Sequence, residues 1–184
     1  MTKTIKTINS VEPNIQLWEE KYKYQEDLTR QLDSYNDNFD QNMINKIVLW
    51  KVSRYAEPND KILSKINLIK KTDQQINIEL TNEILKDLLV TKGFGLPMAT
   101  TVLRFKNPNI YQLIDQRVYR FIFGEPLPKA TKADDLIKTY HLYLDRLKEV
   151  CKQYDINFCN SDRILYQADI IENKGIPLMG YGTI

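Results

Sequence analysis

Residues 83–103, which read EILKDLLVTKGFGLPMATTVL, decide the fold of this chain. Apolar residues recur at helical spacing on both sides of the KGFG sequence at 92–95, which predicts two amphipathic helices joined by a very tight connection. Glycine at two of these positions suits a backbone that has a positive φ or comes close to a neighbour. Pro97 falls in the first turn of the second helix, where its missing N–H costs nothing, and the small Ala99 lets the two helices approach. The stretch predicts a helix-hairpin-helix.

The hairpin glycines would expose consecutive amides at a helix N-terminus, which predicts an anion site that holds a phosphate without reading a base. An ordinary corner between two helices, with glycine as a C-cap, is the alternative. Charge agrees with a phosphate site: residues 61–132 carry 12 Lys and Arg against 6 Asp and Glu, whereas residues 1–60 carry 8 against 10 and residues 133–184 carry 6 against 8. A solvated lysine-rich face would give the same count.

Helical periodicity continues through nearly the whole chain, and no alternating runs rich in Val, Ile and Thr are present to build a sheet. We therefore expect an all-α protein that forms a single compact domain over residues 1–184. The helices are expected over residues 14–33, 40–56, 60–70, 81–91, 96–105, 109–114, 116–123, 133–154 and 160–173.

Composition excludes several classes of protein. The 184 residues, 42% of them hydrophobic, can bury a core without disulfides. No apolar run approaches the roughly 20 residues that span a bilayer, and residues 1–14 lack the apolar centre of a signal peptide, so we expect a soluble, cytoplasmic protein without membrane contact. Cys151, Cys159 and His141 cannot supply the ligands of a structural zinc site or an iron–sulfur cluster. We therefore expect no metal and no cofactor, and any catalysis must use carboxylates, lysines, hydroxyls or backbone amides.

Asp115 is the second feature of interest. It follows the apolar pair Leu113 and Ile114 and directly precedes a predicted helix. An aspartate in this place commonly caps the helix by accepting hydrogen bonds from its free amides, and a cap requires no catalysis. The residue alone therefore leaves both roles open.

The sequences GFGLPMATTVL at 93–103 and LIDQRV at 113–118 together resemble the helix-hairpin-helix DNA glycosylase superfamily, which contains endonuclease III and the adenine glycosylases. Members of that family show a Gly-hydrophobic-Gly hairpin, an alanine four residues after the second glycine, and a catalytic aspartate in a hydrophobic-Asp-x-x-hydrophobic context. These features match Gly93, Gly95, Ala99 and Asp115 in the same register. The close match covers these two stretches, and the surrounding helical arrangement is compatible with the family.

Departures from the family pattern limit what the resemblance implies. Bifunctional members carry a Schiff-base lysine two residues after the second hairpin glycine, and this chain has Pro97 there, which closes that route to lyase chemistry. The four-cysteine cluster of some members is absent from the sequence. Gln116 and Arg117 replace the Thr-His pair of many relatives, which changes the surroundings of Asp115.

The resemblance implies a monofunctional glycosylase of base-excision repair, a monomer that binds double-stranded DNA and hydrolyses the N-glycosidic bond of a damaged or mispaired base. Positive charge develops on the deoxyribose during this cleavage, and the carboxylate of Asp115 would stabilise it while activating water. The residues expected to contact DNA are Lys92, Gly93, Phe94, Gly95, Arg104 and Arg117. A base that leaves the stack needs a pocket with apolar walls, and the candidates for these walls are Trp50, Tyr55, Tyr111 and Tyr119.

Two other functions stay open. A non-catalytic helix-hairpin-helix DNA-binding protein would keep the hairpin and use Asp115 only as a cap, and a helical adaptor would bind no nucleic acid. The two-lobed HhH-GPD-like fold of the family implies one lobe of residues 35–130, with the hairpin at 81–105, and a second lobe of residues 10–34 plus 131–175. In this arrangement the C-terminal helix packs on the N-terminal helix and leaves a cleft beside residues 81–123.

Overall fold

The computed structural model describes residues 5–24, 26–51, 58–91 and 94–178. Over these ranges the chain consists of helices and loops without strands, which confirms the all-α prediction. No helix in the described ranges combines the length and the apolar character that crossing a membrane requires. The helices are η1 (Ile8–Ser10), α1 (Ile15–Glu20), α2 (Glu26–Ser34), α3 (Gln41–Lys51), α4 (Asp60–Leu68), α5 (Ile78–Leu89), α6 (Leu96–Lys106), α7 (Gln116–Phe123), α8 (Ala133–Tyr154), η2 (Phe158–Asn160) and α9 (Ser161–Glu172).

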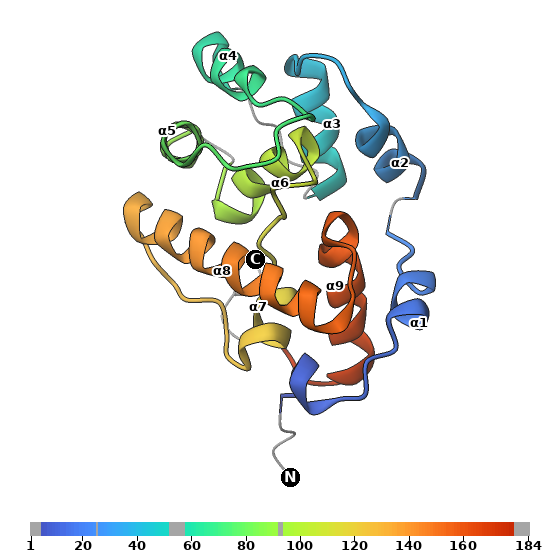
Figure 1. Cartoon of the computed structure of the whole chain (residues 1–184). Coiled ribbons are helices and arrows are strands. Elements are labelled where there is room, and N and C mark those ends of the chain that lie inside the picture. Colours follow the sequence, from blue (N-terminus) through green and yellow to red (C-terminus); the bar gives the residue numbers. More distant parts are fainter. Residues whose placement is uncertain (1–4, 25, 52–57, 92–93, 179–184) are drawn as a thin grey trace.

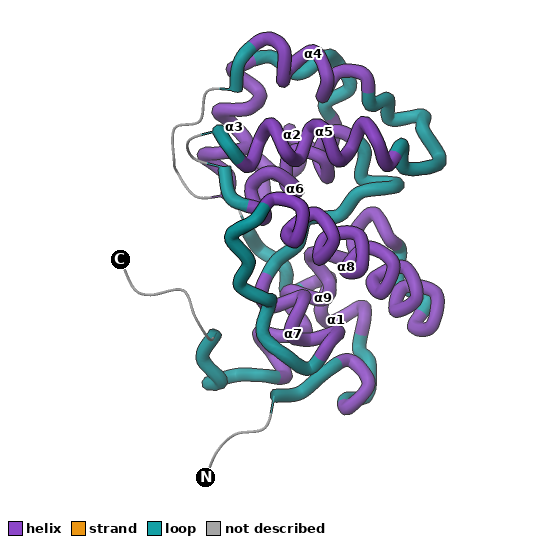
Figure 2. Tube along the Cα trace, turned by 90° about the vertical axis from the view of Figure 1, so that its left-hand side faces the viewer, coloured by secondary structure: helices purple, strands orange, loops and turns teal. Residues whose placement is uncertain are grey.

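The helices form two groups, one above the other in Figures 1 and 2. In the lower group α1 and α7 pack on α9, and α8 packs on α7. In the upper group α2 packs on α3, α3 on α6, and both α4 and α6 on α5, while α5 also contacts α8 and so joins the groups. The expected contact between the C-terminal and N-terminal helices is therefore made by α1. The division differs from the expected lobes in two helices, because α2 belongs with the upper group and α7 with the lower.

The helix expected over residues 14–33 is interrupted, which corrects that prediction. α1 ends at Glu20 and α2 begins at Glu26. Trp18 packs edge-on against Phe121 of the lower group, with ring centroids 5.8 Å apart, whereas Tyr24 packs edge-on against Trp50 of the upper group at 5.0 Å. Because residues six apart lie about 120° apart around a helix, one continuous helix would point the two aromatic rings in different directions, whereas the break lets each ring reach its own partner.

The helix expected over residues 109–114 is also absent, because this segment uses its backbone groups elsewhere. The carbonyls of Gln112 and Leu113 accept hydrogen bonds from the hydroxyls of Tyr140 and Tyr143 of α8, at 2.9 and 2.8 Å. Both hydroxyls are fully buried, and burial raises their pKa values well above the ordinary range. The segment therefore runs as an irregular buried connection between α6 and α7.

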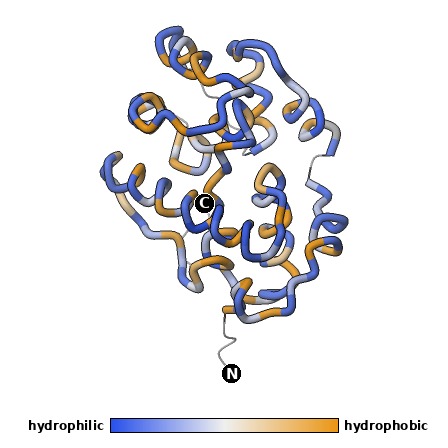
Figure 3. The backbone as a smooth tube through the Cα atoms, viewed as in Figure 1, coloured by the Kyte–Doolittle hydropathy of each residue, from blue (hydrophilic) through white to orange (hydrophobic). Residues whose placement is uncertain are grey.

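The core fills both groups. Hydropathy switches between apolar and polar within single turns of the helices (Figure 3), as expected for amphipathic helices. α6 differs because nearly all of its residues are buried, including Arg104 and Lys106. It is therefore the central helix of the upper group and holds its charged residues inside the protein.

Candidate functional site

Asp115 caps α7 and also faces a pocket. Its Oδ1 accepts a hydrogen bond of 2.8 Å from the backbone N–H of Arg117, which is the N-cap arrangement. Its Oδ2 lies 3.4 Å from Nζ of Lys51, and the two side chains are 19% and 18% exposed. Because a carboxylate has about four lone-pair sites, the cap and the ion pair leave Asp115 able to accept a further hydrogen bond.

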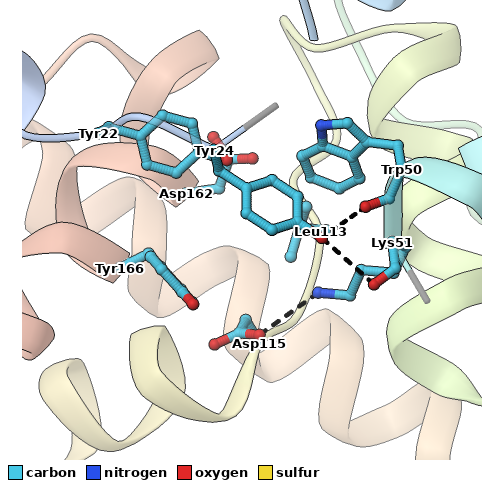
Figure 4. A pocket seen from close by; sticks show the side chains of 8 residues that line it. All are labelled: Tyr22, Tyr24, Trp50, Lys51, Leu113, Asp115, Asp162 and Tyr166. Atoms are coloured by element: carbon cyan, nitrogen blue, oxygen red, sulfur yellow. Dashed lines mark hydrogen bonds and ion pairs between the residues drawn. The ribbon is translucent and has the colours of Figure 1, made fainter. Parts of the chain in front are cut away.

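The pocket beside Asp115 lies between the two groups of helices (Figure 4). Its walls come from the loop between α1 and α2, the C-terminal end of α3, the connection before α7, and the start of α9. Ligand sites are often found at such junctions. The residues that line it are Tyr22, Tyr24, Trp50, Lys51, Leu113, Asp115, Asp162 and Tyr166.

The ring of Tyr24 stands inside this pocket (Figure 4). Its hydroxyl donates a hydrogen bond of 2.5 Å to the backbone carbonyl of Trp50, and its ring meets the indole edge-on. The remaining cavity has a volume of about 40 Å³, which is room for a few water molecules and too little for a nucleobase. A larger ligand therefore requires a side chain of the wall to move, and Tyr24, at 36%, is the most exposed of them.

Of the expected pocket residues that the structure describes, Trp50 is the one that lies in this wall. It is 4% exposed, and its indole N–H donates a hydrogen bond of 2.6 Å to Oγ1 of Thr29. An edge-on contact with Phe105 of α6, with centroids 5.3 Å apart, holds its other side. Trp50 is therefore a rigid wall, in contrast to Tyr24.

Tyr111 and Tyr119 do not line the pocket, which corrects two predictions. Tyr111 is 1% exposed and its hydroxyl shares a hydrogen bond of 2.6 Å with Thr81. Tyr119 is 6% exposed and stacks on Phe123 with centroids 4.3 Å apart. Both are core residues, and Tyr55 lies outside the described residues.

Arg104 is buried, so it is removed from the residues expected to contact DNA. It is 2% exposed, donates a hydrogen bond to Asp33, and donates a second one of 3.1 Å to the carbonyl of Cys159. Burial lowers the pKa of its guanidinium, but the charges of Asp162 and Asp33 outweigh this effect, and the pKa is raised overall. Arg104 therefore stays charged as a buried link between helices rather than as a phosphate contact.

Arg117 is only partly available. Its Nη1 lies 3.1 Å from Oδ2 of the buried Asp169, and its side chain is 29% exposed. The guanidinium also lies over the ring of Tyr166, 5.7 Å from the centroid, at the edge of the pocket. Arg117 thus borders the site and keeps an exposed face.

The two helices on either side of the predicted hairpin are α5 and α6, and they pack against each other. Lys92 and Gly93 lie outside the described residues, and Phe94 is buried at 7% exposure. Gly95 is the N-cap of α6, where no side chain caps the helix. Its φ is −104°, and a Cβ at this position would meet Pro97 Cδ at 3.9 Å, an ordinary contact. The expected positive φ or close neighbour is therefore not found at Gly95 within the described chain.

The sequence did not predict six residues of the pocket: Tyr22, Tyr24, Lys51, Leu113, Asp162 and Tyr166. They come from four separate segments, and no motif or spacing joins them. Across the residues that the structure describes, no group of three or more His, Cys, Asp or Glu is placed to hold a metal ion. The chemistry that the pocket offers consists of two carboxylates, one amine, phenol hydroxyls and aromatic faces.

Comparison of the chain with protein-family models, with curated proteins and with solved structures finds no match.

Proposed function

We propose that this protein is a DNA glycosylase, which binds double-stranded DNA through the hairpin and hydrolyses the N-glycosidic bond of a damaged or mispaired base. The observation that carries the proposal is the position of Asp115, whose carboxylate caps α7 and at the same time lines a pocket with aromatic walls. A residue that served only as a cap would not need this pocket.

The chemistry requires a carboxylate beside the deoxyribose. As the bond from C1′ to the base nitrogen breaks, its electron pair leaves on the base and positive charge develops on the sugar. Asp115 stabilises this charge and accepts a proton from the water that adds to C1′. The cap holds the carboxylate in place during this step, because the backbone N–H of Arg117 binds Oδ1.

The hairpin supports the proposed DNA contact. No side chain caps α6, so its N-terminus can receive an anion. Among the described residues only Pro97 lies within 4 Å of a Cβ placed on Gly95, and an approaching phosphate backbone would use the space beside it. Such contacts are independent of base sequence, and their affinity falls steeply with added salt because counterions are released on binding.

The test is base release from duplexes that each carry one altered or mispaired base, measured by strand cleavage at the resulting abasic site. We expect release from at least one duplex, and a loss of about 10²–10⁴-fold in Asp115→Asn, the range for removal of an acid–base group. Asparagine caps a helix as well as aspartate does, so this variant keeps the fold and serves as its own structural control. No release from any duplex, or an unchanged rate in the variant, would contradict the enzyme.

The alternative function, a non-catalytic DNA-binding protein, has the cap of Asp115 on Arg117 in its favour. It predicts salt-dependent binding of duplex DNA without base release. An adaptor that binds no nucleic acid predicts neither, since without phosphate contacts no counterions are released.

Lys51 bears on the proposed monofunctional reaction, because its amine lies in the pocket beside Asp115. Borohydride added during the reaction reduces any imine between a lysine and the sugar to a stable crosslink. A monofunctional glycosylase gives no crosslink. A crosslink that disappears in Lys51→Gln would show that this amine attacks C1′ and would overturn the monofunctional assignment.

A further inference from the structure

Asp162 holds a carboxylate oxygen without a partner at the wall of the pocket. The residue lies in the first turn of α9, is 4% exposed and lines the pocket. Its Oδ1 has no hydrogen-bond partner among the described residues. Buried acceptors in native proteins are nearly always paired, so an unpaired one points to a partner that is not part of the chain.

Structural pairing accounts for only one oxygen of this carboxylate. Its Oδ2 lies 3.3 Å from Nε of Arg104, but that Nε also makes no hydrogen bond. Arg104 already donates to Asp33 and to the carbonyl of Cys159. The contact with Arg104 therefore keeps Asp162 close to a positive charge but forms no hydrogen bond. An acid in the first turn of a helix is favourable whether or not it lines a pocket, so the helix end does not explain the position of Asp162 either.

The aromatic faces of the remaining walls do not distinguish one base from another. Trp50, Tyr22 and Tyr166 offer aromatic faces, and stacking on such faces tolerates any base because every base has a π-face. The amine of Lys51 is directed at Asp115. Asp115 and Asp162 both keep a free acceptor, but Asp115 is assigned to the water and the sugar. Asp162 is therefore the acceptor left to select a ligand that carries a donor.

We propose that Asp162 selects the base: its Oδ1 accepts a hydrogen bond from an N–H group on the edge of a nucleobase that has left the duplex. Tyr24 moves aside to admit this base. The inference rests on the proposed function, since a base reaches the pocket only if the protein binds DNA and extrudes the nucleotide.

The test compares bases that differ in one N–H group. Duplexes carry adenine or purine, and uracil or 3-methyluracil, on a 2′-fluoroarabino sugar that resists base release, opposite an abasic site. Dissociation constants are measured by fluorescence anisotropy. In at least one pair we expect the base with the N–H to bind about 10- to 100-fold more tightly, as for a hydrogen bond to a charged group. Equal affinity within both pairs overturns the inference.

Variants separate this role from a structural one. In Asp162→Asn the carbonyl can face Arg104 and the amide can face the pocket, which replaces the acceptor by a donor. The preference for the base with the N–H should disappear or reverse. Asp33→Asn is the matched control, because Asp33 also pairs with Arg104 but does not line this pocket, and it should keep the preference. A preference that persists in Asp162→Asn overturns the inference.

The outcomes also separate this inference from the proposed function. Base release that depends on Asp115, together with equal affinity within both pairs, leaves the glycosylase standing and removes the role of Asp162. Absence of salt-dependent DNA binding overturns both. If Asp162→Asn does not fold, the affinities of the unchanged protein for the two pairs still decide the question.

Discussion

Replacement of Asp169 should lower the stability of the fold, because its one buried carboxylate accepts hydrogen bonds from several donors. The residue is fully buried on α9. Arg120 of α7 donates to both of its oxygens, from Nε at 2.6 Å and from Nη2 at 2.7 Å. Arg117 and Asn173 add hydrogen bonds of 3.1 and 2.8 Å. Arg120 is itself only 3% exposed, so its charge depends on this carboxylate.

Replacing Asp169 by Asn leaves the guanidinium of Arg120 buried without a counter-charge. Removing one partner of a buried ion pair costs about 3–5 kcal/mol, and we expect a loss of this size in the free energy of unfolding. For a chain of this length each kcal/mol lowers Tm by about 2–4 °C, which gives a decrease on the order of 10 °C. The measurement is urea unfolding followed by far-ultraviolet circular dichroism, together with a thermal melt.

The control is Glu172→Gln on the same helix. Glu172 pairs with Lys6 at 3.2 Å, but the two side chains are 22% and 53% exposed, and such pairs contribute about 0–1 kcal/mol. If Asp169→Asn lowers stability by no more than this control, then the carboxylate is not what neutralises Arg120, and the reasoning about α7 and α9 is refuted.

Three further predictions concern the hairpin, the pocket and the core. Gly95→Ser should keep or raise Tm, because serine is a better N-cap than glycine. The same variant should weaken duplex binding in an anisotropy titration, because the serine side chain fills the space proposed for the phosphate. Unchanged affinity would contradict that contact. Tyr24→Phe removes the hydrogen bond to the Trp50 carbonyl, worth about 0.5–1.5 kcal/mol, and should tighten binding of the duplexes with the non-hydrolysable sugar by about two- to tenfold, since less energy is needed to open the pocket. Burial and the charges of Lys70 and Lys71 lower the pKa of Lys106 to about 8 from 10.5. Between these two values the folded state has released the proton and the unfolded state still holds it, so the stability of the protein relative to Lys106→Met should rise with pH, by about 3 kcal/mol at most. A difference in urea midpoint between the two proteins that does not change with pH would refute this prediction.

Local features were predictable because they depend on residues close in the sequence. Helices α5 and α6 begin and end within a few residues of the expected bounds, since amphipathic spacing and Pro97 act within a turn or two. The cap of Asp115 on α7 was one of the two predicted roles of that residue. The one segment in this region that was predicted wrongly, residues 109–114, takes its hydrogen bonds from α8, which no local pattern reveals.

The main wrong prediction at the site was that Arg104 lies on the surface, and the sequence of α6 gave a weak local indication that this arginine is buried. α6 has no polar face, because its polar residues other than Arg104 and Lys106 are threonines. A helix that is apolar on every side is buried, so its arginine had to be inside the protein. Proximity to the hairpin in sequence suggested the opposite position.

The sequence by itself determined that the described chain is helical, the bounds of most of its helices to within a few residues, and that an aspartate starts α7. Only the tertiary structure decided which side chains share the pocket. Tyr24, Lys51, Asp115 and Asp162 come from four distant segments, and no interaction between neighbours in the chain relates them. They meet because packing of the upper group of helices against the lower group leaves this pocket between them, and packing depends on the whole set of buried side chains rather than on any one motif.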